Sequence, residues 1–189
     1  MHIVYKLIPH EYERYRTHLL KLDTESRILR FGFQATDAVI DSLCDNIESN
    51  KSQHKIFVIE DAELNVVAAG HIATVGGNME LAFSVLTEYR NQGMGDALLK
   101  RCLRWCQNRN IRQGYMVCLS SNMAMRKLAA RNGLKIVQDG RDTEALVTLP
   151  DADVYTHMDE IISNNWSMLD HTGKLNRKIV RFALKSLTF

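Results

Sequence analysis

Between residues 55 and 85 the side chains follow a two-residue period, and this pattern constrains the fold more than any other feature. Lys55–Glu60 and Asn65–Val75 are β-branched or alternating runs, separated by a polar turn near Asp61–Glu63. Met79–Val85 alternates strictly after the turn signal Gly76-Gly77. Successive side chains of a strand point to opposite faces, and short turns join antiparallel neighbours. The pattern therefore predicts an antiparallel meander of three strands.

Helical periodicity and further strands are predicted on both sides of this meander. Before it we expect a strand at His2–Ile8 and helices at His10–Lys21, at Asp23–Phe33 and after a Thr36 cap. After it we expect a helix at Gly95–Asn108, a strand at Tyr115–Leu119, a helix at Asn122–Arg131, and strands at Leu134–Val137 and Thr143–Leu149. This order predicts an α/β (α+β) fold in which helices cover both faces of a mixed sheet.

Composition excludes several classes of protein. The 189 residues, 46% apolar and 24% charged, are typical of one globular domain. No run approaches 18 apolar residues and Met1–Tyr5 does not open a signal sequence, so we expect a cytoplasmic protein without a membrane span. The cysteines lie in or beside apolar stretches and are expected to be reduced core thiols (Cys44, Cys102, Cys106 and Cys118). Cys102 and Cys106 share a helix face, but no second ligand pair accompanies them, so no metal site is expected.

The stretch Phe83–Gly95 (FSVLTEYRNQGMG) carries the clearest chemical signal. It joins a predicted strand to a predicted helix, and Gly93 and Gly95 would let a ligand approach the backbone. The free N–H groups of a first helical turn, at the positive end of the helix dipole, form an anion site. Asn91–Asp96 could therefore hold a pyrophosphate, while Arg90 pairs with a phosphate or braces the loop. Taken alone, the stretch is equally compatible with a generic glycine-rich connection.

Two motifs in the correct order resemble the GNAT family of acyl-CoA N-acyltransferases. Arg90-x-x-Gly93-x-Gly95 matches the family's acyl-CoA signature, and Asn122 followed by Gly133-Leu134 matches a later family segment. The resemblance covers roughly Lys55–Leu149. The phrase Glu25–Phe31 is similar to the N-terminal helices of bacterial protein-lysine acetyltransferase domains. The resemblance implies a three-layer α-β-α sandwich around a mixed, mostly antiparallel sheet.

The resemblance also implies which residues bind acetyl-CoA, the expected co-substrate. Main-chain groups at Phe83–Val85 would bond the pantetheine arm like an added strand, because the neighbouring strands splay apart there. The N–H of Val85 would donate to the thioester carbonyl. The Asn122 side chain would fix the pantetheine. The implied binding residues are Phe83, Ser84, Val85, Arg90, Asn91, Gln92, Gly93, Met94, Gly95, Asp96 and Asn122.

The sequence offers more than one candidate for each catalytic group. Many family members carry a tyrosine acid seven residues after the asparagine, where this chain has Ala129. Ser120, Ser121 or water could replace that acid. Glu80 shares a predicted strand face with small neighbours, and similar acetyltransferases carry a glutamate there. We therefore expect Glu80 to be the general base, directly or through water, with a solvated strand carboxylate and a His71 base as alternatives.

The end of the chain carries no recognised motif. Residues 151–185 read mostly as helix, interrupted near His171–Gly173. The last part of this region has no acid and contains five basic residues, Lys174, Arg177, Lys178, Arg181 and Lys185. They supply the basic excess of a chain with 24 basic and 22 acidic residues. Leu175, Ile179 and Phe182 fall at helical spacing. We expect a helix docked on its own domain or on a second subunit, in preference to a membrane or nucleic acid surface.

The sequence thus predicts a GNAT domain at residues 1–150 and a helical extension at 151–189. We expect an N-acetyltransferase whose acceptor, a small-molecule or protein amine, attacks acetyl-CoA directly in a ternary complex. Neither a metal nor a nucleic acid or membrane partner is expected, and a homodimer is compatible with the extension. The alternative is a catalytically weak acyl-CoA-binding sensor.

Overall fold

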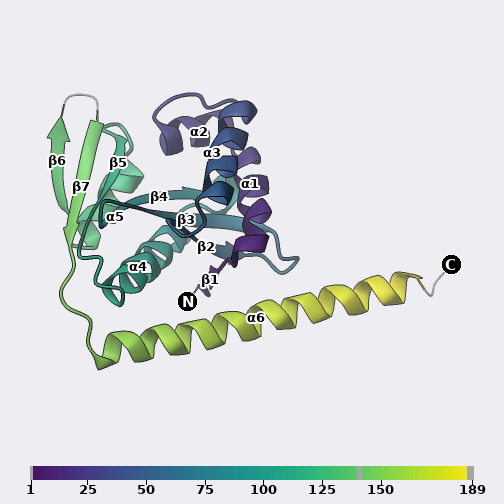
Figure 1. The fold of residues 1–189 in the computed structure, drawn as a ribbon. Helices are drawn as coiled ribbons and strands as arrows, with labels where there is room; N and C mark the ends of the chain where they lie inside the picture. The colour runs from purple at the N-terminus through teal and green to yellow at the C-terminus, as the bar shows by residue number, and fades with distance from the viewer. Residues whose placement is uncertain (1, 140–141, 187–189) are drawn as a thin grey trace.

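A seven-stranded sheet forms the centre of the molecule in the computed structural model, which describes residues 2–139 and 142–186 (Figure 1). The strands lie in the order β1-β2-β3-β4-β5-β7-β6. Their bounds are β1 Tyr5–Lys6, β2 His54–Glu60, β3 Val66–Val75, β4 Asn78–Val85, β5 Gln113–Leu119, β6 Lys135–Asp139 and β7 Asp142–Thr148. Only β4 and β5 pair in parallel among the described strands. The sheet is therefore mixed and mostly antiparallel, as predicted.

Helices cover both faces of the sheet, which confirms the expected layers. The helices are α1 (Tyr12–Leu20), α2 (Thr24–Phe31), α3 (Asp37–Ser49), α4 (Met94–Gln107), α5 (Met123–Arg131) and α6 (Val154–Ser186), with 3-10 turns η1 (Pro9–Glu11) and η2 (Thr87–Tyr89). Helix α4 packs under β2, β3 and β4, while α1 and α3 lie on the opposite face (Figure 1). The first predicted strand is shorter than expected, because β1 pairs with β2 at two positions only.

Strands β2, β3 and β4 form the predicted antiparallel meander. Gly76 and Gly77 form the β3–β4 turn with φ angles of +57° and +82°. Such left-handed conformations suit glycine and match the twist of a hairpin. Phe57 and Ile72 of this meander belong to one buried apolar cluster with Leu98 and Cys102 of α4. The sheet beneath the site is therefore rigidly supported.

Strands β4 and β5 diverge after two paired positions. Met79 pairs with Gly114 and Glu80 with Tyr115, but no further pair joins the two strands in the described chain. The rest of β4, up to Val85, and the rest of β5, up to Leu119, diverge. This is the splay that the resemblance implied, and it leaves one edge of β4 open.

The four cysteines are buried, as expected. Burial raises the pKa of the Cys106 thiol to about 12 and that of the Cys102 thiol well above its ordinary value. Thiols of this kind stay protonated and pack as apolar groups.

Helix α6 corrects one expectation about the C-terminal region. It runs without interruption from Val154 to Ser186, although the sequence suggested a break near His171–Gly173. Gly173 costs a helix interior only about 1 kcal/mol relative to alanine. His171 and Lys174, on either side of it, both bond Glu60 of β2. These contacts hold the helix together across the glycine.

No helix in the described part of the chain is both long and apolar enough to span a bilayer.

Candidate acyl-CoA site

A cavity of about 580 Å³ lies where β4 and β5 diverge. Its lining comes from four places in the chain: one face of α2, the end of β4, the loop into α4, and α5. It contains ten of the eleven predicted binding residues, namely Phe83, Ser84, Val85, Arg90, Asn91, Gly93, Met94, Gly95, Asp96 and Asn122. Gln92 is exposed beside the cavity and does not line it. The glycine-rich loop is therefore one wall of the cavity.

The N-terminus of α4 has no side-chain cap. Gly93 is the N-cap residue with φ +81°, and Asn91 before it has φ +61°. The first intrahelical bond in this turn runs from the Ala97 N–H to the Gly93 carbonyl. The N–H groups at the start of α4 are consequently available to an anion, as the glycine pattern predicted.

The open edge of β4 also presents N–H groups. The Leu86 N–H donates to the Val67 carbonyl at 3.0 Å, toward β3. Because successive N–H groups of a strand point to opposite edges, those of Val85 and Phe83 point toward the gap left by β5. A ligand with alternating amide groups could bond this edge as an added strand.

The charge of the lining is predominantly positive. Arg30, Arg90, Lys127 and Arg131 line the cavity, and Asp96 is its single acid among the described residues. Asp96 is paired with Lys100 at 2.7 Å and accepts a bond from Asn132, and these partners lower its pKa. The field in the cavity thus favours a polyanion.

Arg90 braces the loop, which is one of the two roles expected for it. Its guanidinium donates to Ser26 Oγ at 2.6 Å. Asp23 caps α2 through the Ser26 N–H at 2.7 Å and accepts from Thr87 Oγ1 at 2.6 Å. Hydrogen bonds from Ser26 and Thr87 lower the pKa of Asp23 to about 2. The α2 N-terminus and the β4–α4 loop are therefore locked together.

Asn122 joins α5 to the rest of the site. Its Oδ1 accepts from the Met125 N–H at 3.1 Å, and its Nδ2 donates to the Leu29 carbonyl at 3.4 Å. It is buried and lines the cavity. The asparagine positions α5 against α2 and keeps one amide N–H for another partner.

Sequence reasoning missed several lining residues. The α2 residues Ser26, Leu29 and Arg30 come from a segment that approaches β4 only in the fold. Ala124, Lys127, Leu128 and Arg131 lie on one face of α5, because the last three follow Ala124 by three, four and seven residues. Tyr89 could have been found as a neighbour of Arg90.

Glu80 lies outside the cavity, at the last position where β4 and β5 pair. Its carboxylate is exposed and accepts from the Tyr115 hydroxyl at 3.5 Å. The charge of Glu80, together with burial, raises the pKa of Tyr115, so this phenol stays protonated. From Glu80 to Phe83, the first lining residue of β4, the strand spans roughly 10 Å.

The surroundings of His71, the alternative candidate for the general base, do not suit that role. It is buried, and its Nε2 lies 3.0 Å from Nδ1 of His54. Burial and the nearby Arg30 charge hold the pKa of His71 well below its usual range. Ala129, the position of the absent tyrosine, is fully buried and does not line the cavity. Ser120 bonds Thr143, and neither it nor Ser121 is in the lining.

A buried histidine supports the β4 wall from behind. His18 Nδ1 lies 3.0 Å from the Val66 carbonyl and its Nε2 lies 2.8 Å from Ser84 Oγ. Since a carbonyl only accepts, Nδ1 carries the proton and Ser84 donates to Nε2. Burial lowers the pKa of His18 to about 4. The neutral ring thus fixes the Ser84 hydroxyl away from the open strand edge.

This neutral histidine predicts an acid-labile fold. Unfolded His18 would take up a proton near pH 6.5, while the folded ring resists protonation to about pH 4. Stability is therefore full above pH 6.5 and falls as the pH drops, by roughly 3 kcal/mol on approaching pH 4. Urea unfolding at pH 7.5, 6 and 5 measures this loss.

The control for that measurement is His18→Gln, which keeps hydrogen-bonding groups but does not titrate. It should unfold with a flatter pH dependence than the native chain, whatever its absolute stability. Equal slopes for the two proteins would contradict the assignment of the acid sensitivity to His18.

The fold and cavity together define an acyltransferase: a mixed sheet opened between two parallel strands, beside an uncapped helix start. The comparisons with known proteins agree. Residues 17–134 match the model of the Acetyltransferase (GNAT) family, so the chain belongs to this family of acyltransferases. The chain is 26% identical over 140 residues to acetyltransferase PA5475 of Pseudomonas aeruginosa, covering 71% of this chain and 75% of that protein.

Two solved structures share the fold. The GNAT domain of S. lividans PAT superposes with a TM-score of 0.64 at 16% identity, covering 77% of this chain and 89% of that one. The PaiA N-acetyltransferase from Thermoplasma acidophilum, solved in complex with coenzyme A, gives a TM-score of 0.59 at 14% identity, covering 77% and 98%.

Proposed function

We propose that this chain transfers acetyl from acetyl-CoA to a primary amine by direct attack in a ternary complex. The observation that carries the proposal is the open edge of β4, which meets an uncapped helix N-terminus in one positively charged cavity. The cavity offers donors for amide carbonyls along one wall and for phosphates at its end. That combination fits acetyl-CoA as a substrate.

Each part of the substrate would have a separate set of residues. The N–H groups of Asn91–Asp96 would hold the pyrophosphate, with Lys127 and Arg131 as nearby cations. The Phe83 and Val85 N–H groups would bond the pantetheine, and the free amide N–H of Asn122 would add a contact from α5. The Val85 N–H would also stabilise the charge that develops on the thioester oxygen. Gln92 lies outside the cavity, so it would contribute only its main-chain N–H group to the pyrophosphate site.

The transfer itself requires a neutral amine. Its nitrogen would attack the thioester carbon, the carbon–sulfur bond would break, and the electron pair would leave on the coenzyme A sulfur. The amine proton would pass to Glu80, through water because Glu80 lies beyond the cavity wall. Tyr115 would orient the carboxylate through its hydroxyl. Coenzyme A is a good leaving thiolate near neutral pH, because thiols titrate near about 8.5.

The second candidate function is a catalytically weak acyl-CoA sensor. Ala129 favours it, since the position of the family's tyrosine acid holds a buried alanine that does not line the cavity. Such a module would retain the binding site and lack turnover.

Thiol release separates these two functions. The chain is incubated with acetyl-CoA and, in turn, small amines, lysine peptides and cell protein, and free coenzyme A is followed. We expect acceptor-dependent release, together with thermal stabilisation by acetyl-CoA. Stabilisation without release on any acceptor would identify the sensor. Neither stabilisation nor release would contradict both functions, and ping-pong kinetics would contradict direct attack.

A further inference from the structure

Helix α6 docks on its own domain through polar side chains. Its buried residues are Thr156, Glu160 and Ser167, and Asn164, His171 and Lys174 on the same side are half-buried. Helices of globular proteins normally turn an apolar stripe inward. The polarity of α6 is the reverse of that arrangement.

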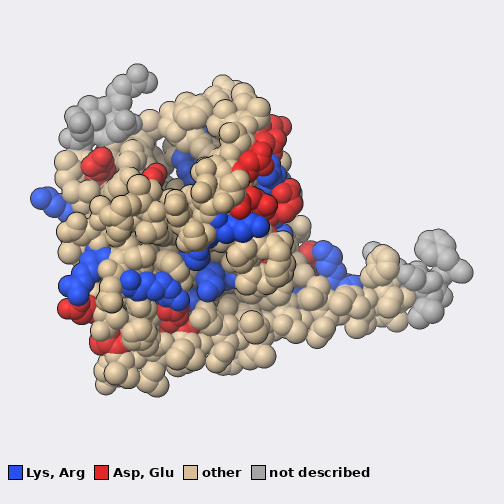
Figure 2. Space-filling view, viewed as in Figure 1, with Lys and Arg blue, Asp and Glu red and all other residues tan. Residues whose placement is uncertain are grey.

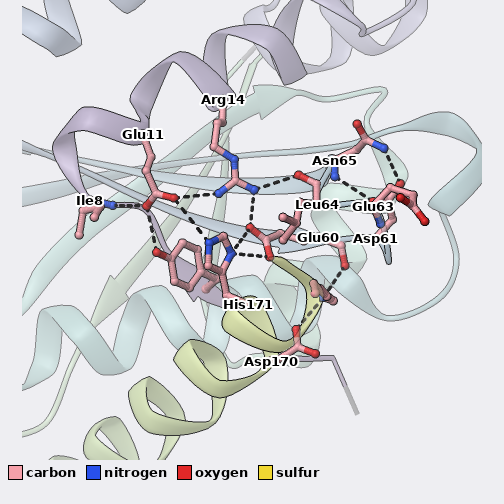
Figure 3. A network of polar contacts seen from close by, with 12 residues as sticks. Ile8, Glu11, Arg14, Glu60, Asp61, Glu63, Leu64, Asn65, Asp170 and His171 are labelled. Atoms are coloured by element: carbon pink, nitrogen blue, oxygen red, sulfur yellow. Dashed lines mark hydrogen bonds and ion pairs between the residues drawn. The ribbon is translucent and has the colours of Figure 1, made fainter. Parts of the chain in front are cut away.

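Specific bonds hold this polar side in place along the length of the domain. Glu160 bonds Arg109 at 3.0 Å and Asn108 at 2.7 Å, and Asn164 accepts from Arg101 at 2.5 Å. Further along α6, His171 contacts Glu60 at 3.0 Å, within a network that also includes Arg14 and Glu11 (Figure 3). The orientation of α6 is therefore set by several directional contacts.

The outward side of α6 is apolar and exposed. Its exposed apolar residues include Val154, Tyr155, Met158, Ile161, Ile162, Trp166, Met168, Leu169, Leu175, Ile179 and Val180, and each of these is at least 41% accessible. Figure 2 shows a largely uncharged surface along the helix, which projects beyond the domain. An apolar surface this continuous marks an interaction site.

The spacing of these residues indicates a helical partner. Val154, Met158, Ile161, Met168, Leu175 and Ile179 fall on a single ladder whose steps alternate between four and three residues, and Asn165 and Thr172 occupy its two remaining positions. This is the 3.5-residue period of a coiled-coil seam. A polar residue such as Asn165 in a seam fixes the register of the pair. We call this ladder the α6 seam.

Charge along α6 selects the partner and its direction. Residues 151–173 contain Asp151, Asp153, Asp159, Glu160 and Asp170 and no lysine or arginine, whereas residues 174–186 are basic without an acid. The acids Asp151, Asp159 and Glu160 are paired with arginines of their own domain, so the unequal feature is the basic half. A parallel pair would set the two basic halves together, whereas an antiparallel pair places each beside the partner's half that has no lysine or arginine. Because lysine and arginine are absent from the more apolar half, the helix differs from those that bind anionic membranes.

We propose that the α6 seam pairs with the α6 seam of a second copy, antiparallel across a two-fold axis. Such an interface is isologous and closes at two subunits. The part of α6 that projects past its own domain would lie along the domain-bound half of the partner's helix. Residues 151–189 are then an extension that serves assembly, separate from the catalytic domain at residues 1–150.

The first test is the mass of the full chain in solution. Analytical ultracentrifugation from 1 to 100 µM should give a dimer of twice the 21.6 kDa chain mass. Ile161→Glu with Met168→Glu places charges in the seam and should weaken dimerisation at least 100-fold. The matched control is Val137→Glu, at an exposed apolar residue of β6, which should remain dimeric. Circular dichroism verifies that each variant is folded.

The second test is the direction of the pair. The native cysteines are buried, so single thiols introduced as Val154→Cys and Ile179→Cys react selectively with a short bis-maleimide. An antiparallel dimer should cross-link when the two variants are mixed, and poorly when either is alone. Cross-linking of each variant with itself would overturn the antiparallel arrangement. A native chain that stays monomeric at 100 µM, including one that binds anionic vesicles instead, would overturn the proposal.

Discussion

Glu80→Gln is expected to lower kcat by about 10²- to 10⁴-fold, the usual contribution of a general base. Glutamine keeps the size and hydrogen-bonding of the side chain but cannot accept the amine proton. Because Glu80 lies outside the cavity, KM for acetyl-CoA should change less than threefold. Initial rates of coenzyme A release at saturating acceptor, from pH 6.5 to 9.5, measure the effect.

The pH series distinguishes a lost base from a disturbed structure. An acceptor amine near pKa 10 is more often neutral at high pH, so the deficit of the variant should shrink as the pH rises. The control is Glu144→Gln, on β7, whose carboxylate also contributes to the raised pKa of Tyr115 but lies on the far side of β5. It should retain nearly full activity. A Glu80→Gln enzyme within threefold of native kcat would remove Glu80 from the mechanism.

Short-range sequence patterns predicted most of the fold. The alternation of Met79–Val85 follows from the pleat of a strand, which points successive side chains to opposite faces. Gly76 and Gly77 are suited to the turn because it requires left-handed backbone angles. The uncapped start of α4 could also be predicted from the sequence, because a glycine at a helix start has no side-chain oxygen to cap it. These features depend on neighbours in the chain and need no knowledge of the tertiary structure.

Other parts of the site depend on contacts between distant segments. Ser26 meets Arg90 across 64 residues, and His18 meets Ser84 across 66. No local period encodes such pairs. Helix α6 is a further case. The sequence predicted that it is amphipathic, but not which of its sides packs on the domain. That choice depends on Arg101 of α4, Arg109 of the turn after α4, and Glu60 of β2, which all bond its polar side.

Gly114→Ala is expected to destabilise the fold by at least about 3 kcal/mol, the upper part of the range for overpacking. Gly114 pairs with Met79 at the point where β4 and β5 join. A Cβ at position 114 would overlap Met79 Cγ and lie 2.5 Å from the Met79 carbonyl oxygen. Met79 is fully buried and its main chain belongs to the sheet, so neither group can yield. Thermal unfolding should show a Tm lower by about 6–12 °C.

The consequence for the site should be as large as that for stability. Met79–Gly114 and Glu80–Tyr115 are the two pairs from which the cavity opens, and forcing them apart moves both Glu80 and the free edge of β4. Gly173→Ala is the matched control: a Cβ there meets nothing within 4 Å, and alanine in a helix interior gains about 1 kcal/mol over glycine. The two substitutions add the same methyl group and should shift Tm in opposite directions. A Gly114→Ala protein with native Tm and native affinity for acetyl-CoA would mean that the junction is looser than its packing indicates.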